Sequence, residues 1–298
     1  MRIPPVVIPA LTFFVSILAL ANSQAAATVA RGVYDYNRTF TTAPGISYEL
    51  LFLESWAAPD TFYPQEASTL TGALSVIAKR GRTPILSVQP FHSDAVGSAA
   101  SLLPDVAAGK YDAIIASLSA SVKAYGGPIL IRWGHEMDFP QNVGRYDWAT
   151  NNPAAYIAAY RHVISLFSRY LGSHAAYIWS PGGAANANHY YPGDAYCNYI
   201  GCTLFSWSSA ALKWIQDSSF TRIFGPRYKA LAVHGKKIII CEFGVATSDD
   251  QAAGIAAATA AFPNFSQLAA VIYFNSRDNV SWWPGGSIPD WSISPALW

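Results

Sequence analysis

Short apolar runs recur along residues 28–298, and most of them lead through a polar stretch into a longer segment. The apolar positions within a run are continuous rather than alternating, which is typical of strands buried on both faces of a parallel sheet. The runs are Val29–Tyr36, Leu50–Ser55, Pro84–Phe91, Pro128–Trp133, Ala175–Trp179, Tyr199–Phe205, Lys237–Phe243 and Ala269–Phe274. The pattern therefore predicts eight parallel strands.

Segments with apolar residues at helical spacing fill most of the gaps between these runs. They are Ala67–Arg80, Ala107–Tyr125, Pro153–Tyr170 and Ser208–Lys213, with an Ala-rich segment at Gln251–Ala261. Pro153 follows two Asn residues, which suits the first turn of a helix behind a capping residue. Eight strand units separated by helices, with no linker between them, predict an α/β fold, a (β/α)8 TIM barrel forming a single domain over residues 28–298. A doubly wound parallel sheet is the alternative.

Polar or aromatic residues follow most of the predicted strands, directly where each strand ends. They are Asp35, Glu54, Trp56, His92, Arg132, His135, Glu136, Trp179, Glu242 and Asn275. In a (β/α)8 barrel the carboxyl ends of all strands meet on one rim, and the active site lies there. These side chains are therefore expected to converge.

Two of the five Glu residues, Glu136 and Glu242, stand at the ends of apolar strands. Side chains an even number of positions apart on a strand share a face. Glu136 is four positions after Arg132 and Glu242 is two positions after Ile240, so both carboxylates would point into the barrel mouth if the strand geometry persists to them. Paired carboxylates across a cleft suit glycosidic cleavage, where one protonates the leaving oxygen and the other faces the anomeric carbon. The alternative is that both are solvated strand ends, or that one pairs with Arg132.

The motifs around these residues resemble glycoside hydrolase family 26, a group of retaining endo-β-glycanases on a (β/α)8 barrel. "IRWGHEMD" precedes "CEFG" by about a hundred residues, with "YPGD" between them. The resemblance implies that Glu136 is the acid/base and Glu242 the nucleophile. It also implies that His135 binds substrate or orients the carboxyl groups, and that Arg132 keeps the nucleophile ionised.

The chain departs from the family pattern at two places. Members that cleave mannan usually carry Asn after HEM, where this sequence has Asp138, and many place a Tyr near the nucleophile, where Phe205 stands here. These departures leave the catalytic pair intact but weaken mannan as the expected substrate. A β-glucan or an unusual polymer becomes a comparable expectation.

Aromatic residues make up 14% of the chain, including ten Trp. Aromatic faces suit the apolar C–H surface of sugar rings, although Trp and Tyr can equally be core residues. The candidate substrate-binding residues, besides His135 and Arg132, are Trp179, Tyr191, Trp133, Phe274, Trp283 and His92.

Composition limits the partners and the compartment. A formal net charge of +1 gives no electrostatic reason to expect nucleic acid or an anionic membrane. Residues 1–27 read as a secretory signal peptide, with Arg2 before the apolar stretch Val6–Leu20 and small residues beyond it, which predicts a secreted or periplasmic protein. A retained anchor is the alternative.

The three cysteines, Cys197, Cys202 and Cys241, lack the spacing of a metal site and lie on or beside apolar runs. We expect buried free thiols, and the alternative is that two of the three cysteines form a disulfide. We expect neither a metal nor a cofactor. No GxSxG motif supports a serine esterase. The sequence thus predicts a secreted, monomeric, retaining endo-β-glycanase acting on a β-mannan-type or β-glucan-type polysaccharide. The alternative is a catalytically weak barrel that only binds polysaccharide.

Overall fold

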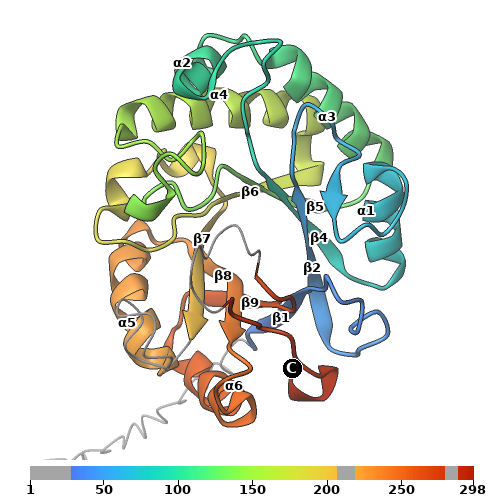
Figure 1. The fold of residues 1–298 in the computed structure, drawn as a ribbon, viewed down its shortest axis with the longest axis vertical. Helices are drawn as coiled ribbons and strands as arrows, with labels where there is room; N and C mark the ends of the chain where they lie inside the picture. The colour runs from blue at the N-terminus through green and yellow to red at the C-terminus, as the bar shows by residue number, and fades with distance from the viewer. Residues whose placement is uncertain (1–27, 207–218, 279–287) are drawn as a thin grey trace, which may run out of the picture.

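The computed structural model describes residues 28–206, 219–278 and 288–298. Its strands are β1 (Ala30–Tyr34), β2 (Ile46–Leu53), β3 (Phe62–Tyr63), β4 (Thr83–Val88), β5 (Ile129–Trp133), β6 (Ala175–Trp179), β7 (Tyr199–Ser206), β8 (Lys237–Val245) and β9 (Leu268–Phe274). All except β3 run parallel, and β1 pairs with both β2 and β9. The parallel sheet is therefore closed, as Figure 1 shows, and the predicted (β/α)8 barrel is confirmed over the doubly wound alternative.

The helices lie outside the barrel. They are α1 (Leu70–Lys79), α2 (Leu102–Ala107), α3 (Asp112–Tyr125), α4 (Pro153–Leu171), α5 (Phe220–Leu231) and α6 (Gln251–Ala261). The helix predicted over residues 107–125 is confirmed from Asp112 to Tyr125 as α3, but its predicted start is wrong, because the chain turns at Gly109 (φ +83°) between α2 and α3. The prediction also missed α5, whose pattern contains Pro226, and the predicted helix Ser208–Lys213 lies outside the described residues.

Helix α4 shows how local sequence sets an element of the barrel. The Asn152 side chain accepts a hydrogen bond from the Ala155 backbone N–H at 3.1 Å, and Pro153 occupies the first turn. Such a cap stabilises a helix by about 1 kcal/mol. Its buried face, which includes Tyr156 and Tyr160, packs toward the strands, so the predicted start of this helix is confirmed.

Two apolar layers separate the inside of the barrel from the space beneath the helices. One cluster combines inward-facing residues from opposite strands, such as Leu50, Leu130 and Ile272, and fills the barrel interior. The larger cluster lies between strands and helices. Successive strand residues alternate between the two layers, so side chains on the inner layer reach the rim where the strands end.

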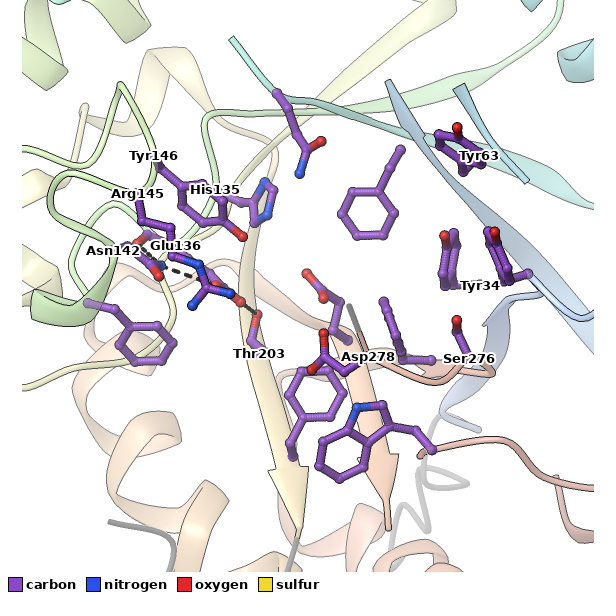
Figure 2. A pocket seen from close by; sticks show the side chains of 18 of the residues that line it. Tyr34, Tyr63, His135, Glu136, Asn142, Arg145, Tyr146, Thr203, Ser276 and Asp278 are labelled. Atoms are coloured by element: carbon purple, nitrogen blue, oxygen red, sulfur yellow. Dashed lines mark hydrogen bonds between the residues drawn. The ribbon is translucent and has the colours of Figure 1, made fainter. Parts of the chain in front are cut away.

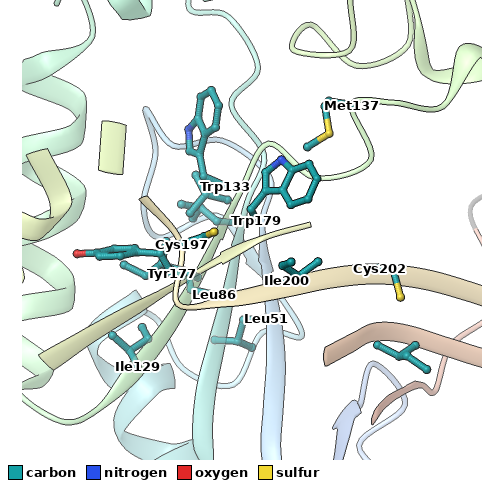
Figure 3. Packing of buried hydrophobic residues seen from close by; sticks show 14 of the residues in the cluster. Leu51, Leu86, Ile129, Trp133, Met137, Tyr177, Trp179, Cys197, Ile200 and Cys202 are labelled. Carbon is teal, nitrogen blue, oxygen red and sulfur yellow. The ribbon is translucent and has the colours of Figure 1, made fainter. Parts of the chain in front are cut away.

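Trp133 and Trp179 belong to the outer layer. Both are fully buried among the strands, helices and loops, as Figure 3 shows. The adjacent residues Arg132 and Ile178 face the barrel interior instead. The prediction that Trp133 and Trp179 bind sugar is therefore wrong, because neither ring is accessible.

The cysteines are buried, and all three are free thiols, as predicted. Cys202 and Cys197 lie in the outer layer, and Cys241 lies in the barrel interior. Burial raises the pKa of Cys241, which keeps its thiol protonated. These thiols act as small apolar side chains.

Candidate active site

A cavity of about 890 Å³ opens at the carboxyl ends of the barrel strands. Five residues that the sequence places at the rim or among the binding candidates line it: Glu54, His135, Glu136, Glu242 and Phe274. Figure 2 shows His135 and Glu136 on one wall, with Tyr34 and Tyr63 on the opposite wall. The convergence of strand ends expected from the barrel therefore holds for both candidate carboxylates.

Glu136 reaches the cavity on a turn after β5 rather than on a continued strand. Strand β5 ends at Trp133, and both Gly134 and Glu136 have left-handed backbone, with φ of +56° and +55°. The prediction that strand geometry persists to Glu136 is wrong. A left-handed conformation costs about 1–3 kcal/mol for a residue other than Gly, so surrounding contacts must hold it.

Four contacts hold this turn. The Glu136 N–H donates to the Ser180 carbonyl at 2.9 Å. Tyr156 donates its hydroxyl to the Gly134 carbonyl at 3.0 Å, and the Trp148 indole N–H donates to the His135 carbonyl at 2.7 Å. The Asn142 amide donates to the Glu136 carbonyl at 3.1 Å. The turn after β5 is thus fixed from three sides, which fits a strained residue with a functional role.

Glu242 reaches the same cavity through an irregularity in β8. Ile240 pairs with Cys202 but Glu242 pairs with Thr203, so Cys241 is an extra residue in the ladder. Ile240 packs in the outer layer, whereas both Cys241 and Glu242 face inward. A β-bulge has this effect, because it inverts the alternation beyond the extra residue. The predicted shared face of Ile240 and Glu242 is therefore wrong, although the predicted destination of Glu242 is right.

Arg132 lies fully buried beneath the cavity and contacts Glu242. Its Nη1 is 2.6 Å from Glu242 Oε1, and its Nε donates to Ser180 Oγ at 2.9 Å. Its Nη2 donates to Thr203 Oγ1 at 3.4 Å. The predicted pairing of Arg132 with the second carboxylate is observed, and it fixes the position of Glu242 through a charge-assisted hydrogen bond.

The two carboxyl groups are joined through Thr203. The Thr203 hydroxyl donates to Glu136 Oε1 and accepts a hydrogen bond from Arg132. Arg132 in turn donates to Glu242 Oε1. Asn142 donates its amide to Glu136 Oε2 at 3.3 Å. Glu136 thus has neutral partners, whereas Glu242 has a cationic one.

The electrostatics of the site follow from this difference. Burial raises the pKa of Glu242 to about 7, the Arg132 guanidinium opposes that rise, and the charge of Glu136 adds to it. Burial and the nearby Arg132 charge hold the pKa of His135 well below its ordinary value. His135 is therefore a neutral imidazole, and its Nδ1 lies 3.5 Å from Ser87 Oγ.

Aromatic rings form much of the wall, and three of them, Tyr34, Phe52 and Trp291, were not among the predicted binding residues. Tyr34 packs against Phe274 at 4.7 Å between ring centroids and edge-on against Phe52 at 5.0 Å. Phe205 stacks on Trp291 at 4.5 Å, and all five rings line the cavity. Phe205 thus presents a ring without a hydroxyl near Glu242, as the sequence departure indicates.

Other predicted binding residues lie elsewhere. His92 does not line the cavity and instead fastens a loop, with its Nδ1 2.7 Å from Asp147 Oδ2. Tyr191 stacks on His234 at 3.7 Å, also away from the cavity. The structure therefore contradicts the predicted sugar contacts of His92 and Tyr191. Trp283 lies outside the described residues.

Asp138, which stands where the family usually has Asn, is a loop brace. Its carboxylate accepts hydrogen bonds from the backbone N–H groups of Gly182 at 2.6 Å, Gly183 at 3.0 Å and Ala184 at 2.7 Å. The loop after β6 is thereby held against the turn after β5. Among the described residues, no group of His, Cys, Asp and Glu is arranged to hold a metal ion, and no helix is long and apolar enough to cross a membrane.

The chain was compared with known protein families, curated proteins and solved structures. No protein-family model matches the chain. The chain is 29% identical over 188 residues to endoglucanase H of Acetivibrio thermocellus, which covers 60% of this chain and 21% of that protein. The chain thus matches about a fifth of the length of this curated relative.

Solved structures match most of the chain. The catalytic domain of the family 26 endo-β-1,4-mannanase of Bacillus sp. JAMB-750 has a TM-score of 0.62 at 17% identity, covering 83% of this chain and 77% of that chain. The family 26 β-mannanase BoMan26A of Bacteroides ovatus has a TM-score of 0.63 at 13% identity, covering 91% and 86%. The chain therefore shares its fold with these family 26 structures, and family 26 is the family that its motifs resemble.

Proposed function

We propose that this chain is a retaining endo-β-glycanase in which Glu136 is the acid/base and Glu242 the nucleophile. One observation carries the proposal: carboxyl groups from the turn after β5 and from β8 face the same cavity, and within the described residues Glu242, unlike Glu136, forms an ion pair with a buried cation. Because a cation favours the ionised form, Arg132 opposes the rise in pKa that burial causes at Glu242, which supports the nucleophile role for that residue. A pair of carboxyl groups in these two roles matches the needs of glycosidic cleavage.

The reaction follows from these positions. Glu136 donates a proton to the departing glycosidic oxygen while Glu242 attacks the anomeric carbon and forms a covalent glycosyl intermediate. Glu136, now ionised, takes a proton from water, which attacks the anomeric carbon and releases Glu242. The neutral imidazole of His135 borders the same cavity and can hydrogen-bond a sugar hydroxyl without adding charge.

The substrate is a polysaccharide with β-linked sugars, held against the aromatic wall of Tyr34, Phe52 and Phe274. The names of the similar proteins support a β-glucan-type or β-mannan-type backbone, since one is an endoglucanase and the others are β-mannanases. The pattern of residues 1–27 supports export, so we propose that the protein acts outside the cytoplasm, as a monomer.

A direct test incubates the protein with mannan, mixed-linkage β-glucan, β-1,3-xylan and xyloglucan, and identifies the products. We expect short oligosaccharides from at least one polymer, formed early in the reaction, as internal cleavage produces. Retention of a polymer in an affinity gel without any new reducing ends would contradict hydrolysis and favour the binding-only alternative.

A further inference from the structure

The cavity has two chemically different ends. Tyr34 and Tyr63 lie on the wall opposite Glu136, and Figure 2 shows Arg145 and Asn142 beside Glu136. A second guanidinium, that of Arg227, also lines the cavity. A glycan that crosses the cavity from the aromatic end therefore meets cationic side chains once it passes Glu136.

Arg227 reaches the cavity from α5 because two glycines leave room for it and its neighbour. Gly183 has φ of +96°, and a Cβ on it would lie 2.6 Å from Arg227 Cδ. A Cβ on Gly182 would lie 2.3 Å from the Phe139 ring. The Arg227 guanidinium lies over that ring at 5.9 Å from its centroid. The absence of side chains at these two glycines in the loop after β6 therefore leaves space for the Phe139 ring and the Arg227 side chain to lie next to each other.

The hydrogen-bonding capacity of Arg227 is largely unused within the chain. A guanidinium has five N–H donors. In the part of the chain that the structure describes, its one hydrogen-bond acceptor is the Thr203 carbonyl. The nearby Asp138 carboxylate already accepts from three backbone N–H groups. Glu136 accepts from Thr203 and Asn142.

The cost of this arrangement points to a ligand. Arg227 is half-buried, and a cation partly removed from water without a hydrogen-bonded carboxylate partner is less stable than one in water. Burial lowers the pKa of Arg227, although the charges of Cys202, Asp138 and Glu136 oppose that change. A planar guanidinium binds a carboxylate through two parallel hydrogen bonds, which suits recognition of an acidic sugar.

We propose that the glycan bound in this cavity carries a carboxylate-bearing sugar beside Glu136, and that Arg227 binds its carboxylate, with Arg145 on the adjoining wall. This inference rests on the proposed function, because it names the substrate class of the same site. The carboxylate belongs either to a uronic acid in the backbone or to an acid substituent on a neutral sugar. Both sources have the same chemistry at Arg227.

The test compares oligosaccharides that differ only in the carboxylate. Binding is measured in the full chain carrying Glu136→Gln, so that cleavage does not consume the ligand, using β-1,4-glucuronan and cello-oligosaccharides of equal length. A parallel pair consists of β-1,4-mannuronan and manno-oligosaccharides. We expect tighter binding of one uronan by about 10- to 100-fold, the range of hydrogen bonds to charged groups.

Substitution assigns that preference to Arg227. Adding Arg227→Gln should remove it, while Arg222→Gln, an exposed position on the same helix, should leave it intact. Circular dichroism melting checks that both variants fold. Arg227→Lys should keep part of the preference, because it keeps the charge and loses the planar fork.

A third arm identifies the source of the carboxylate, with glucan oligosaccharides that do or do not carry pyruvate ketals. Preference for the ketal form alone, lost with Arg227→Gln, would support the inference with a substituent as the source. Equal or weaker binding of every acidic ligand, or a preference that survives Arg227→Gln, would overturn it. Cleavage of a neutral polymer by the wild-type protein, with no acidic ligand bound more tightly than its neutral counterpart, would overturn the inference and leave the proposed function standing. Arg227-dependent binding without cleavage of any acidic or neutral polymer would support the inference on carboxylate binding and contradict the proposed hydrolysis.

Discussion

Strand β5 ends three residues before Glu136, which lies at the cavity on a turn with left-handed backbone. Strand β8, by contrast, continues through Glu242, and a β-bulge makes the Glu242 side chain face inward. The first arrangement depends on hydrogen bonds from neighbouring loops to the backbone. The second depends on the regular ladder of the barrel and on an ion pair with Arg132. The same rim thus receives one carboxyl group from a braced loop and one from a strand.

The two carboxyl groups differ in the charge of their partners. Glu136 accepts hydrogen bonds from the Thr203 hydroxyl and the Asn142 amide, which carry no charge. Glu242 is bonded to a cation that favours the ionised form. Removing each side chain, or its partner, should therefore have distinct consequences.

The largest effect is expected from Glu242→Ala, which removes the proposed nucleophile. Cleavage of polysaccharide should fall by about 10⁴-fold or more, on the scale seen when a nucleophile is removed. Azide should restore part of the rate and give a glycosyl azide of inverted configuration, since it can occupy the vacated space. An unchanged rate without azide would rule out Glu242 as the nucleophile.

Glu136→Ala should reduce polysaccharide cleavage by about 10²–10⁴-fold, the usual contribution of general acid–base catalysis. With an aryl glycoside whose leaving group needs no protonation, formation of the intermediate should be affected far less. Comparing the two substrates by steady-state and burst kinetics measures this difference. Equal losses on both substrates would contradict the acid role of Glu136.

Arg132→Met should destabilise the fold by about 3–5 kcal/mol, because it leaves Glu242 buried without its cation. Urea unfolding measures the loss. The double variant with Glu242→Gln should recover most of the stability, since neither partner then carries a buried charge. A double variant no more stable than Arg132→Met alone would show that the ion pair is not the cause.

The pH dependence of stability should also separate the two carboxyl groups. Because the folded pKa of Glu242, about 7, exceeds its ordinary value of 4.5, the native state binds more protons than the unfolded state between these values. Stability from protonated Glu242 is therefore present below pH 4.5 and lost as pH rises through 7, by up to about 3 kcal/mol. Glu242→Gln should flatten this part of the unfolding curve against pH, and an unchanged slope would contradict it.

The sequence was sufficient for the architecture because eight buried strands are visible as continuous apolar runs. It was also sufficient for both carboxylates, although the route was wrong in each case. Strand parity broke down at Gly134, where the chain turns, and at Cys241, where an extra residue enters the ladder. Neither event has a signal in the local apolar pattern.

The binding residues were predicted less well, for reasons that differ. Side-chain alternation along β5 predicts the position of Trp133, since an inward-facing Arg132 requires its neighbour to face outward, whereas the position of Trp133 at a strand end does not. Tyr34 and Thr203 lie on inner strand positions whose importance depends on partners distant in sequence. Arg227 comes from α5, a helix that the sequence pattern did not reveal.

The most direct test of the catalytic pair is to trap the intermediate. An activated 2-deoxy-2-fluoro glycoside of the cleaved sugar should react with the wild-type protein and stop at the covalent stage, and peptide mass spectrometry should place the label on Glu242. The label should still form on Glu242 in the Glu136→Ala variant, because this leaving group needs no acid, and turnover should be slower. A label on a different carboxylate of a protein that cleaves polysaccharide would contradict the pairing of these two residues.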